Sequence, residues 1–394
     1  MLPLSIFSIL TFTILFTLAS ASATYNVVNF GARPDGKTDS TKAFLNAWAS
    51  ACSSAGQASI YVPLGNYLLA STTIFNGQTC KSNAITIRID GTLLAPSDYR
   101  VLGNVKNWII FQRVNGLSIY GGTLNAQGSA LWACKATGKS CSTGVTSLEF
   151  SNSNNIFISG LASSNSQKFH IAINGCKNVK LQNLKVSAPA NSPNTDGVHV
   201  SSSSGVTILN SRISTGDDCI SVGPGTTNMW IEGTVCGPGH GISIGSLGKD
   251  MQEQGVQNIT VTTTRFISTQ NGFRIKTWAK PSNGFVKNVL FMHAIMDNVK
   301  NPIIIDQHYC DYRSNCPNQA SGIKISDVTY EDIQGSSATQ VAVKFDCSNK
   351  YPCSGIRLED VALTYGGRNG ITIKSSCANS IGSASGVVEP DSCL

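Results

Sequence analysis

A short hydrophobic pattern recurs along the chain from residue 116 onward. Two apolar residues occupy alternate positions, and a small or polar residue follows two positions later. Alternation with a period of two is typical of a half-buried strand, and its recurrence predicts a stack of equivalent strands. Most copies are 23 to 34 residues apart, which is the length of one solenoid coil. The copies are Leu117/Ile119/Gly121, Ile156/Ile158/Gly160, Val179/Leu181/Asn183, Val206/Ile208/Asn210, Met229/Ile231/Gly233, Ile259/Val261/Thr263, Val289/Phe291/His293, Ile323/Ile325/Asp327 and Ile356/Leu358/Asp360.

This repeat predicts an all-β chain folded as a single-domain parallel β-helix, because no break in composition divides residues 24–394. A leucine-rich horseshoe is disfavoured, since its Leu-rich consensus and helical connectors are absent. Before the repeat, Thr38 or Asp39 could cap a short helix in which Phe44 and Trp48 share one face. We expect this helix to cover the open first coil, although Trp48 could instead bind a partner.

Residues 1–23 predict a signal peptide. They contain no charge, are apolar from Ile6 to Leu18, and end in Ala21-Ser22-Ala23, a small-residue site of the kind that signal peptidase cuts. The early residues lack Lys and Arg, which leaves a retained membrane anchor as the alternative. We therefore expect a secreted, extracellular or cell-wall protein with no membrane association after cleavage.

The 13 cysteines of a secreted chain predict disulfides, and the odd count leaves at least one thiol unpaired. We expect Cys176 to be free. No Cys-x-x-Cys pair is present and histidine is scarce, so a zinc site is not expected. Short spacings favour the pairs Cys134–Cys141, Cys310–Cys316, Cys347–Cys353 and, between adjacent coils, Cys219–Cys236.

Composition supports short strands over long helices, because only 13% of residues are charged and 37 are glycine. The formal net charge of +7 is dispersed, without a Lys/Arg block, so we expect no nucleic-acid partner. A dispersed positive charge either favours polyanionic partners or only aids solubility.

Three carboxylates and one imidazole lie at coil spacing, namely Asp196, Asp217, Asp218 and His240. Steps of 21 and 23 residues separate Asp196 from Asp217 and Asp217 from His240, so stacked coils bring them to the strand spacing of roughly 4.8 Å. Crowded carboxylates cannot all ionise easily, so one should keep a proton and act as an acid while others activate water, as glycoside hydrolysis requires. A stacked Asn/Asp ladder or a calcium site is the alternative.

Residues near these acids in the sequence affect how the acids are presented and what surrounds them. Asp217 and Asp218 would point to opposite faces of a regular strand, but Gly216 permits a bend that presents both. Arg274 and Lys276 are two residues apart and share a strand face, where they form either a clamp for a carboxylate or a solvated surface.

Three further side chains are ambiguous. His240 lies between two glycines, a context that lets it approach a ligand, but a structural histidine fits equally well. His199, in a Val-His-Val strand, is assigned to the wall or core. Tyr309 either stacks on a sugar ring or packs.

Together, four motifs resemble those of glycoside hydrolase family 28, the polygalacturonases of plants and fungi. The order and spacing of the motifs make the resemblance specific, and it extends from residue 29 to the final cysteines. The matching segments are Asn194-Thr195-Asp196, Gly216-Asp217-Asp218-Cys219, Gly239-His240-Gly241 and Arg274-Ile275-Lys276, followed by Tyr309.

The resemblance implies a right-handed parallel β-helix that hydrolyses α-1,4 bonds of polygalacturonan (pectin) with inversion, without cofactor or metal. We expect a monomer. By motif, Asp217 is the general acid and Asp196 and Asp218 activate water, while His240 supports the acid. The expected substrate contacts are Arg274 and Lys276, which grip its carboxylate, together with Tyr309 and Asn194.

One residue departs from the family pattern, and alternative functions and modes of attack remain open. His308 stands where many relatives have Asn, which affects only the detail of a subsite. A calcium-dependent pectate lyase and a non-catalytic pectin-binding wall protein are the alternative functions. Loop lengths at the groove ends decide between endo and exo attack, and we expect endo.

Overall fold

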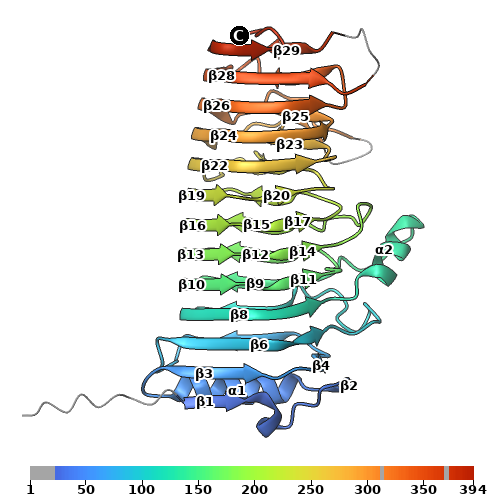
Figure 1. Cartoon of the computed structure of the whole chain (residues 1–394), viewed down its shortest axis with the longest axis vertical. Helices are drawn as coiled ribbons and strands as arrows, with labels where there is room; N and C mark the ends of the chain where they lie inside the picture. The colour runs from blue at the N-terminus through green and yellow to red at the C-terminus, as the bar shows by residue number, and fades with distance from the viewer. Residues whose placement is uncertain (1–22, 311–314, 368–371) are drawn as a thin grey trace, which may run out of the picture.

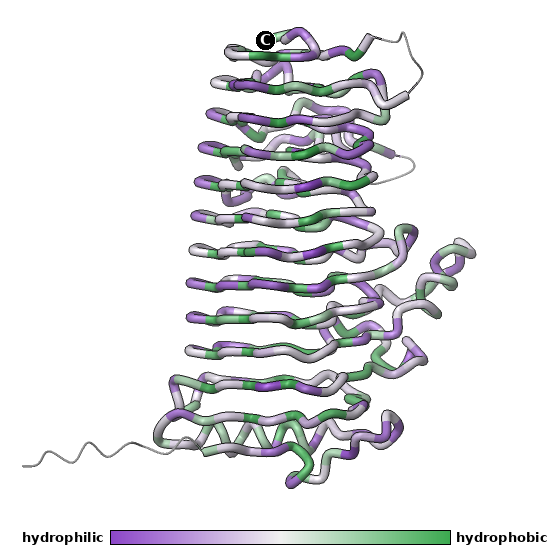
Figure 2. The backbone as a smooth tube through the Cα atoms, in the orientation of Figure 1, coloured by the Kyte–Doolittle hydropathy of each residue, from purple (hydrophilic) through white to green (hydrophobic). Residues whose placement is uncertain are grey.

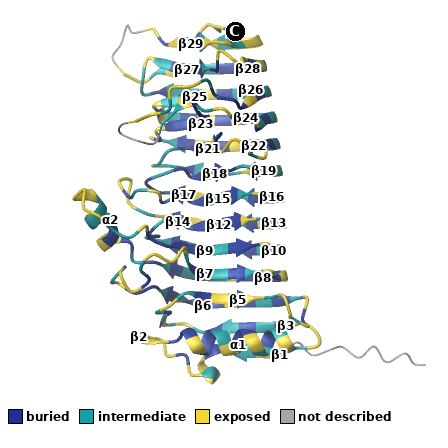
Figure 3. Ribbon diagram, turned by 180° about the vertical axis from the view of Figure 1, so that it is seen from behind, coloured by how far each residue is buried: buried dark blue, intermediate teal, exposed yellow. Residues whose placement is uncertain are grey.

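The computed structural model describes residues 23–310, 315–367 and 372–394. The chain climbs as a stack of coils from the N-terminal helix to the C-terminus (Figure 1), and its strands pair in parallel with the coils before and after. This is the predicted right-handed parallel β-helix. One side of the stack is a sheet of eleven described strands, shown in Figure 3. Its strands are β5 (Thr73–Asn76), β7 (Asn107–Gln112), β9 (Thr146–Ser151), β12 (Ile171–Asn174), β15 (Val198–Ser201), β18 (Ile220–Val222), β21 (Ile242–Leu247), β23 (Asn271–Trp278), β25 (Asn301–Tyr309), β27 (Val341–Asp346) and β29 (Lys374–Ala378).

The remaining strands form a second sheet, with nineteen described members, that bends around the rest of the coil. The bend is visible where the long strand β8 pairs with two short strands in succession, β10 and β11. The members are β1 (Ala23–Asn26), β2 (Asp35–Asp39), β3 (Ala58–Val62), β4 (Asn66–Leu68), β6 (Ile85–Leu94), β8 (Asn115–Asn125), β10 (Asn154–Ser159), β11 (Ala162–Ser164), β13 (Lys177–Gln182), β14 (Lys185–Ser187), β16 (Ser204–Leu209), β17 (Arg212–Ser214), β19 (Thr227–Glu232), β20 (Val235–Cys236), β22 (Val256–Ile267), β24 (Phe285–Val299), β26 (Lys324–Ser337), β28 (Cys353–Tyr365) and β30 (Ser380–Glu389).

The recurring pattern forms the interior of the stack. Ile156 pairs with Leu117 on one side and Val179 on the other, and all three are buried. Apolar and polar residues alternate along each coil, as Figure 2 shows. The small or polar residue that ends each unit adopts a left-handed conformation, with φ of 68° at Gly121 and 55° at Asn183. Gly and Asn tolerate this region best, so the third position of the pattern marks a corner of the coil.

The register of one predicted copy is wrong. The sequence places a copy at residues 323–327, but the equivalent segment is 328–332. Val289 pairs with Val328, and Val328 pairs with Ile356. Apolar residues alternate in both windows, so hydropathy alone does not select between them; the paired neighbours do.

The predicted cap is helix α1 (Thr41–Ser53), which lies against the first coil (Figure 1). Its N-cap residue is Ser40, not the predicted Thr38 or Asp39, although the Asp39 carboxylate accepts a hydrogen bond from Thr41 N at 2.9 Å. Trp48 is 4% exposed and donates through Nε1 to the carbonyl of Asn76, so it packs and is not presented to a partner.

Two short helices were not predicted. A 3-10 turn spans Val27–Phe30, and helix α2 (Ser129–Ala136) projects from the side of the stack (Figure 1). The disulfide Cys134–Cys141 joins the last turn of α2 to the following loop. A helix inserted in a connection leaves the strand pattern unchanged, so the repeat gave no signal for it.

All four predicted disulfides are present, and Cys176 is a buried free thiol. Two further bonds, Cys52–Cys80 and Cys377–Cys393, close the ends of the stack. The predicted leader lies outside the described residues except for Ala23, which begins β1. Within the described ranges, none of the helices has the length and apolar character needed to cross a membrane.

Candidate active site

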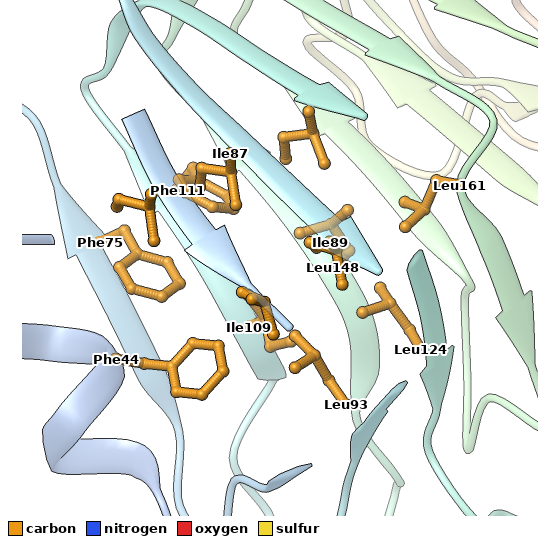
Figure 4. A pocket seen from close by; sticks show the side chains of 13 residues that line it. Phe44, Phe75, Ile87, Ile89, Leu93, Ile109, Phe111, Leu124, Leu148 and Leu161 are labelled. Carbon is orange, nitrogen blue, oxygen red and sulfur yellow. The ribbon is translucent and has the colours of Figure 1, made fainter. Parts of the chain in front are cut away.

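The cavity found inside the described coils is too small for a substrate. An apolar cavity of about 30 Å³ lies near the N-terminal cap and is lined by side chains such as Phe44, Phe75 and Phe111 (Figure 4). This volume is about that of one water molecule. Chemistry on a polymer must therefore occur on the outer surface.

The predicted acids meet on the outside of the eleven-strand sheet. Val198 pairs with Ile220, and Ile220 pairs with Ile242. Two residues before each of these paired positions stand, in the order of the coils, Asp196, Asp218 and His240. Adjacent parallel strands are roughly 4.8 Å apart, so these three residues lie in one column across three coils. The member from the middle coil is Asp218, one residue after the Asp217 from which the sequence spacing was counted.

Asp218 is held by two buried cations. Its Oδ1 accepts hydrogen bonds from Arg274 at 2.7 Å and from the Ser243 hydroxyl at 2.8 Å, and its Oδ2 accepts one from Lys276 Nζ at 2.8 Å. Arg274 Nε also donates to Ser243 at 2.9 Å. Arg274 and Lys276 are 8% and 7% exposed, so both cations are enclosed with the carboxylate that they bind. They share one strand face, as predicted, and the carboxylate that they clamp in this structure belongs to Asp218.

Asp196 is the end of a hydrogen-bonded chain of three side chains. The Ser221 hydroxyl donates to Asp196 Oδ2 at 2.6 Å and lies 2.8 Å from His199 Nδ1. A hydroxyl has one proton, so His199 Nδ1 must donate to Ser221 while Ser221 donates to Asp196. The ring of His199 stacks on Phe169, with centroids 4.6 Å apart. His199 was assigned to the wall or core, and its contact with the acids was missed because the linking residue is a serine one coil away.

Asp217 faces His240. The carboxylate Oδ1 of Asp217 accepts hydrogen bonds from Asp218 N at 2.8 Å and from His240 Nδ1 at 3.0 Å, and His240 N donates to the Asp217 carbonyl at 2.8 Å. Both of these hydrogen bonds to the carboxylate end on Oδ1, so among the described residues no side chain or backbone N–H donates to Oδ2. Asp217 is also the least enclosed of the three acids, because Asp196 and Asp218 are buried while Asp217 is half-buried.

Close packing, more than flexibility, explains the glycines of the motifs. A Cβ on Gly216 would lie 2.1 Å from the Ser192 carbonyl oxygen, so the chain can pass this point only without a side chain. Gly241 combines a φ of 91° with a backbone contact of 2.1 Å from Asn271 O to an added Cβ. Both glycines fix the positions of the adjacent catalytic candidates.

The electrostatic environment drives the pKa values of Asp196 and Asp218 apart. Burial raises the pKa of Asp196 well above 3.8, and the neighbouring Asp217 and Asp218 raise it further. Burial acts in the same direction on Asp218, but Lys276 and Arg274 outweigh it and lower its pKa to about 2. Two neighbouring carboxyls thus differ in how readily they lose a proton, which is the kind of arrangement that acid and base catalysis requires.

A metal ion is not favoured at these acids. Ligand atoms of Asp217, Asp218 and His240 lie within 4.8 Å of one another. Both oxygens of Asp218, however, already accept hydrogen bonds from cationic side chains, and a divalent ion would have to displace or repel them. The calcium alternative is therefore weakened by the charges beside it.

A second group of possible ligands lies further along the sheet. Atoms of Asp306, His308 and Asp346 lie within 4.8 Å of one another, and Lys344 Nζ is 3.2 Å from Asp346. His308, the residue that departs from the family pattern, makes a contact of 3.1 Å with Asp346 and is exposed.

The remaining predicted residues frame the acids. Tyr309 lies edge-on to Trp278, with ring centroids 5.3 Å apart, and Lys276 Nζ is 5.2 Å from its ring centroid. Its ring thus packs beside the buried cations. Asn194 is exposed, with a φ of 57°, in the turn that precedes Asp196.

A groove opens beside His199 and runs away from the acids across β15, β12, β9 and β7. Its volume is about 470 Å³. The lining combines polar and apolar surface and includes aromatic Phe169 and three charged side chains, Lys106, Glu149 and Lys168. These four residues were not predicted, because they come from three different coils and none lies in a motif.

Comparison with known proteins identifies the family of this fold and site. Residues 52–386 match the model of glycosyl hydrolases family 28. A polygalacturonase of Prunus persica is 62% identical over 393 residues, 99% of each chain. An exopolygalacturonase of Arabidopsis thaliana is 42% identical over 362 residues, which cover 91% of this chain and 83% of the relative. Among solved structures, an endo-xylogalacturonan hydrolase from Aspergillus tubingensis superposes with a TM-score of 0.80 at 26% identity and covers 92% of this chain and all of the other.

Proposed function

The chain belongs to glycosyl hydrolases family 28 and is a glycoside hydrolase, and we propose that it is a secreted polygalacturonase that cleaves α-1,4 bonds of de-esterified pectin. The observation that carries this proposal is the split between neighbouring acids, in which Asp218 is held ionised by Arg274 and Lys276 while the pKa of Asp196 is raised. An extended match to a polygalacturonase of Prunus persica supports the substrate class.

In the proposed mechanism Asp217 is the general acid. Its Oδ1 is fixed by Asp218 N and His240, so a proton on Oδ2 points away from these two hydrogen bonds and is transferred to the glycosidic oxygen as the bond breaks. His240 orients the acid and contacts the bound sugar.

Asp196 and Asp218 activate the attacking water. A carboxylate with a raised pKa is the stronger base, so Asp196 accepts the proton from water, and Ser221 holds its other oxygen in place. Asp218 remains ionised and keeps Arg274 and Lys276 beside the reacting sugar, where Tyr309 and Asn194 line the site. We propose inversion at the anomeric carbon on the basis of the family resemblance.

Endo attack is the proposed mode. The groove beside His199 continues away from the acids over several coils, so a polymer can extend past the point of cleavage. Family relatives with exo action exist, such as the Arabidopsis thaliana exopolygalacturonase, so the groove ends decide the outcome. The enzyme requires no cofactor in this scheme and acts as a monomer.

Digestion of polygalacturonate tests the proposal. The expected products are reducing ends without ultraviolet absorbance, formed equally in the presence of a chelator, and the early products are mid-sized oligomers. Galacturonic acid as the only early product would replace endo by exo attack. An unsaturated, absorbing product that requires calcium would establish a lyase instead, and binding without cleavage would establish a wall-binding protein.

A further inference from the structure

One position in each coil forms a second column beside the acids. Ile109, Leu148, Ile171, Val198 and Ile220 are paired in register across β7, β9, β12, β15 and β18. The residues three positions before them are Lys106, Val145, Lys168, Thr195 and Asp217. The proposed acid Asp217 thus ends a column in which lysines stand two and four coils away, roughly 10 and 20 Å at the strand spacing.

Lys168 lines the groove and is separate from the cations that bind the acids. Arg274 and Lys276 are enclosed and bound to Asp218. The half-buried Lys168 makes no ion pair with a carboxylate of the described ranges. Its ammonium group lies 4.8 Å from the ring centroid of Phe169, which stacks on His199. An aromatic ring attracts a cation that lies over its face. The ring of Phe169 therefore helps to hold the Lys168 ammonium group within the groove.

Glu149 gives the groove an opposing charge. It lies on β9 among the groove-lining residues, and its carboxyl interacts with Asn107, Lys106, Asn174 and, most weakly, Lys168. Burial raises its pKa, yet above that pKa it repels a carboxylate that lies over the centre of the groove. The carboxylate of an acidic sugar is therefore directed toward Lys106 and Lys168 and away from Glu149.

We propose that Lys168, with Lys106 beyond it, binds the carboxylates of sugar units that lie in the groove on the β12 side of the cleavage point, and that Glu149 directs those carboxylates toward the lysines. This inference rests on the proposed function, since it assigns the acidic units of the same substrate. The chemistry is an ion pair between an ammonium and a uronate carboxylate, made while the reacting sugar sits at the acids.

Charge-neutral variants test this assignment on polygalacturonate at low ionic strength. Lys168→Gln should raise KM roughly 2- to 5-fold, the range for a partly exposed charge pair, with kcat changed less than twofold because the contact is the same in ground and transition states. The difference should shrink at high salt, where exposed charges are screened. Glu149→Gln should lower KM above the pKa of Glu149.

Lys180→Gln is the matched control, because Lys180 is an exposed lysine on β13, a strand of the nineteen-strand sheet. It should leave KM unchanged, and all three variants should melt at the wild-type temperature. A KM for Lys168→Gln equal to that of Lys180→Gln, or a salt-independent increase, would overturn the inference while leaving the proposed function intact. Absence of cleavage by the wild type would overturn the proposed function and this assignment together.

Discussion

Replacing Asp218 by Asn should both abolish activity and destabilise the fold. The introduced amide would keep an acceptor for Arg274 and Ser243 but turn an N–H donor toward Lys276 Nζ, which now donates to Asp218 Oδ2 at 2.8 Å. Two buried cations would then lack a counter-charge. Breaking a buried ion pair by removing one partner costs about 3–5 kcal/mol.

The pKa of Asp218 gives an independent estimate of the same effect. Lowering it from 3.8 to about 2 corresponds to roughly 2–3 kcal/mol in favour of the ionised form in the folded state. This contribution is complete above pH 3.8 and is lost as the pH falls through about 2. The variant should therefore lose about 2–5 kcal/mol at neutral pH, a large share of a typical total of about 5–15 kcal/mol, and the gap should narrow between pH 3.8 and 2.

Urea unfolding of the disulfide-intact protein measures this loss, read as a shift of the midpoint at constant slope. Asp98→Asn is the control, because Asp98 also pairs with an arginine, Arg100, but both side chains are exposed. That variant should lose less than about 1 kcal/mol. Equal losses for Asp218→Asn and Asp98→Asn, or a gap that does not depend on pH, would show that the buried charge pairs do not stabilise the fold.

Three further predictions follow from the same contacts. Ser221→Ala removes the hydrogen bond that lowers the pKa of Asp196, so the acidic limb of the pH profile of kcat/KM should move to higher pH. Ser221→Thr should return the limb to its wild-type position. An unmoved limb in Ser221→Ala would show that Ser221 does not tune the pKa of the base. Asp196→Asn should abolish activity without loss of stability at neutral pH, because burial and like charges disfavour the ionised form, and a melting temperature well below that of the wild type would contradict this. Gly241→Ala adds a Cβ 2.1 Å from Asn271 O at a φ of 91°. The variant should therefore lose more than about 1 kcal/mol of unfolding free energy, and kcat should fall because His240 is displaced. A fully active variant would show that the backbone relaxes.

The sequence predicted the fold because one physical signal, the alternation of apolar residues, repeats in nearly every coil. It failed at residues 323–327, where a second alternating window lies five residues before the one that pairs with the neighbouring copies at Val289 and Ile356. It also missed α2, since a helix in a connecting loop does not alter the spacing of the strands around it.

The acids were predictable because coil spacing converts sequence distance into contact. The partner of Arg274 and Lys276 was not, since a strand face shows which side chains are neighbours but not which of two carboxylates they bind. His199 contacts Asp196 through Ser221 of the next coil. Lys168 lies over Phe169, which stacks on His199 one coil away. Such contacts between coils have no local signature in the sequence.

The role of Asp217 is best tested by the rate at which Asp217→Asn releases reducing ends from polygalacturonate. Loss of a general acid should lower kcat by about 10²- to 10⁴-fold, with KM and urea midpoint near the wild-type values. Asp98→Asn, prepared in parallel, should retain full activity. A variant at Asp217 that cleaves polygalacturonate at the wild-type rate would contradict the assignment of this residue as the acid.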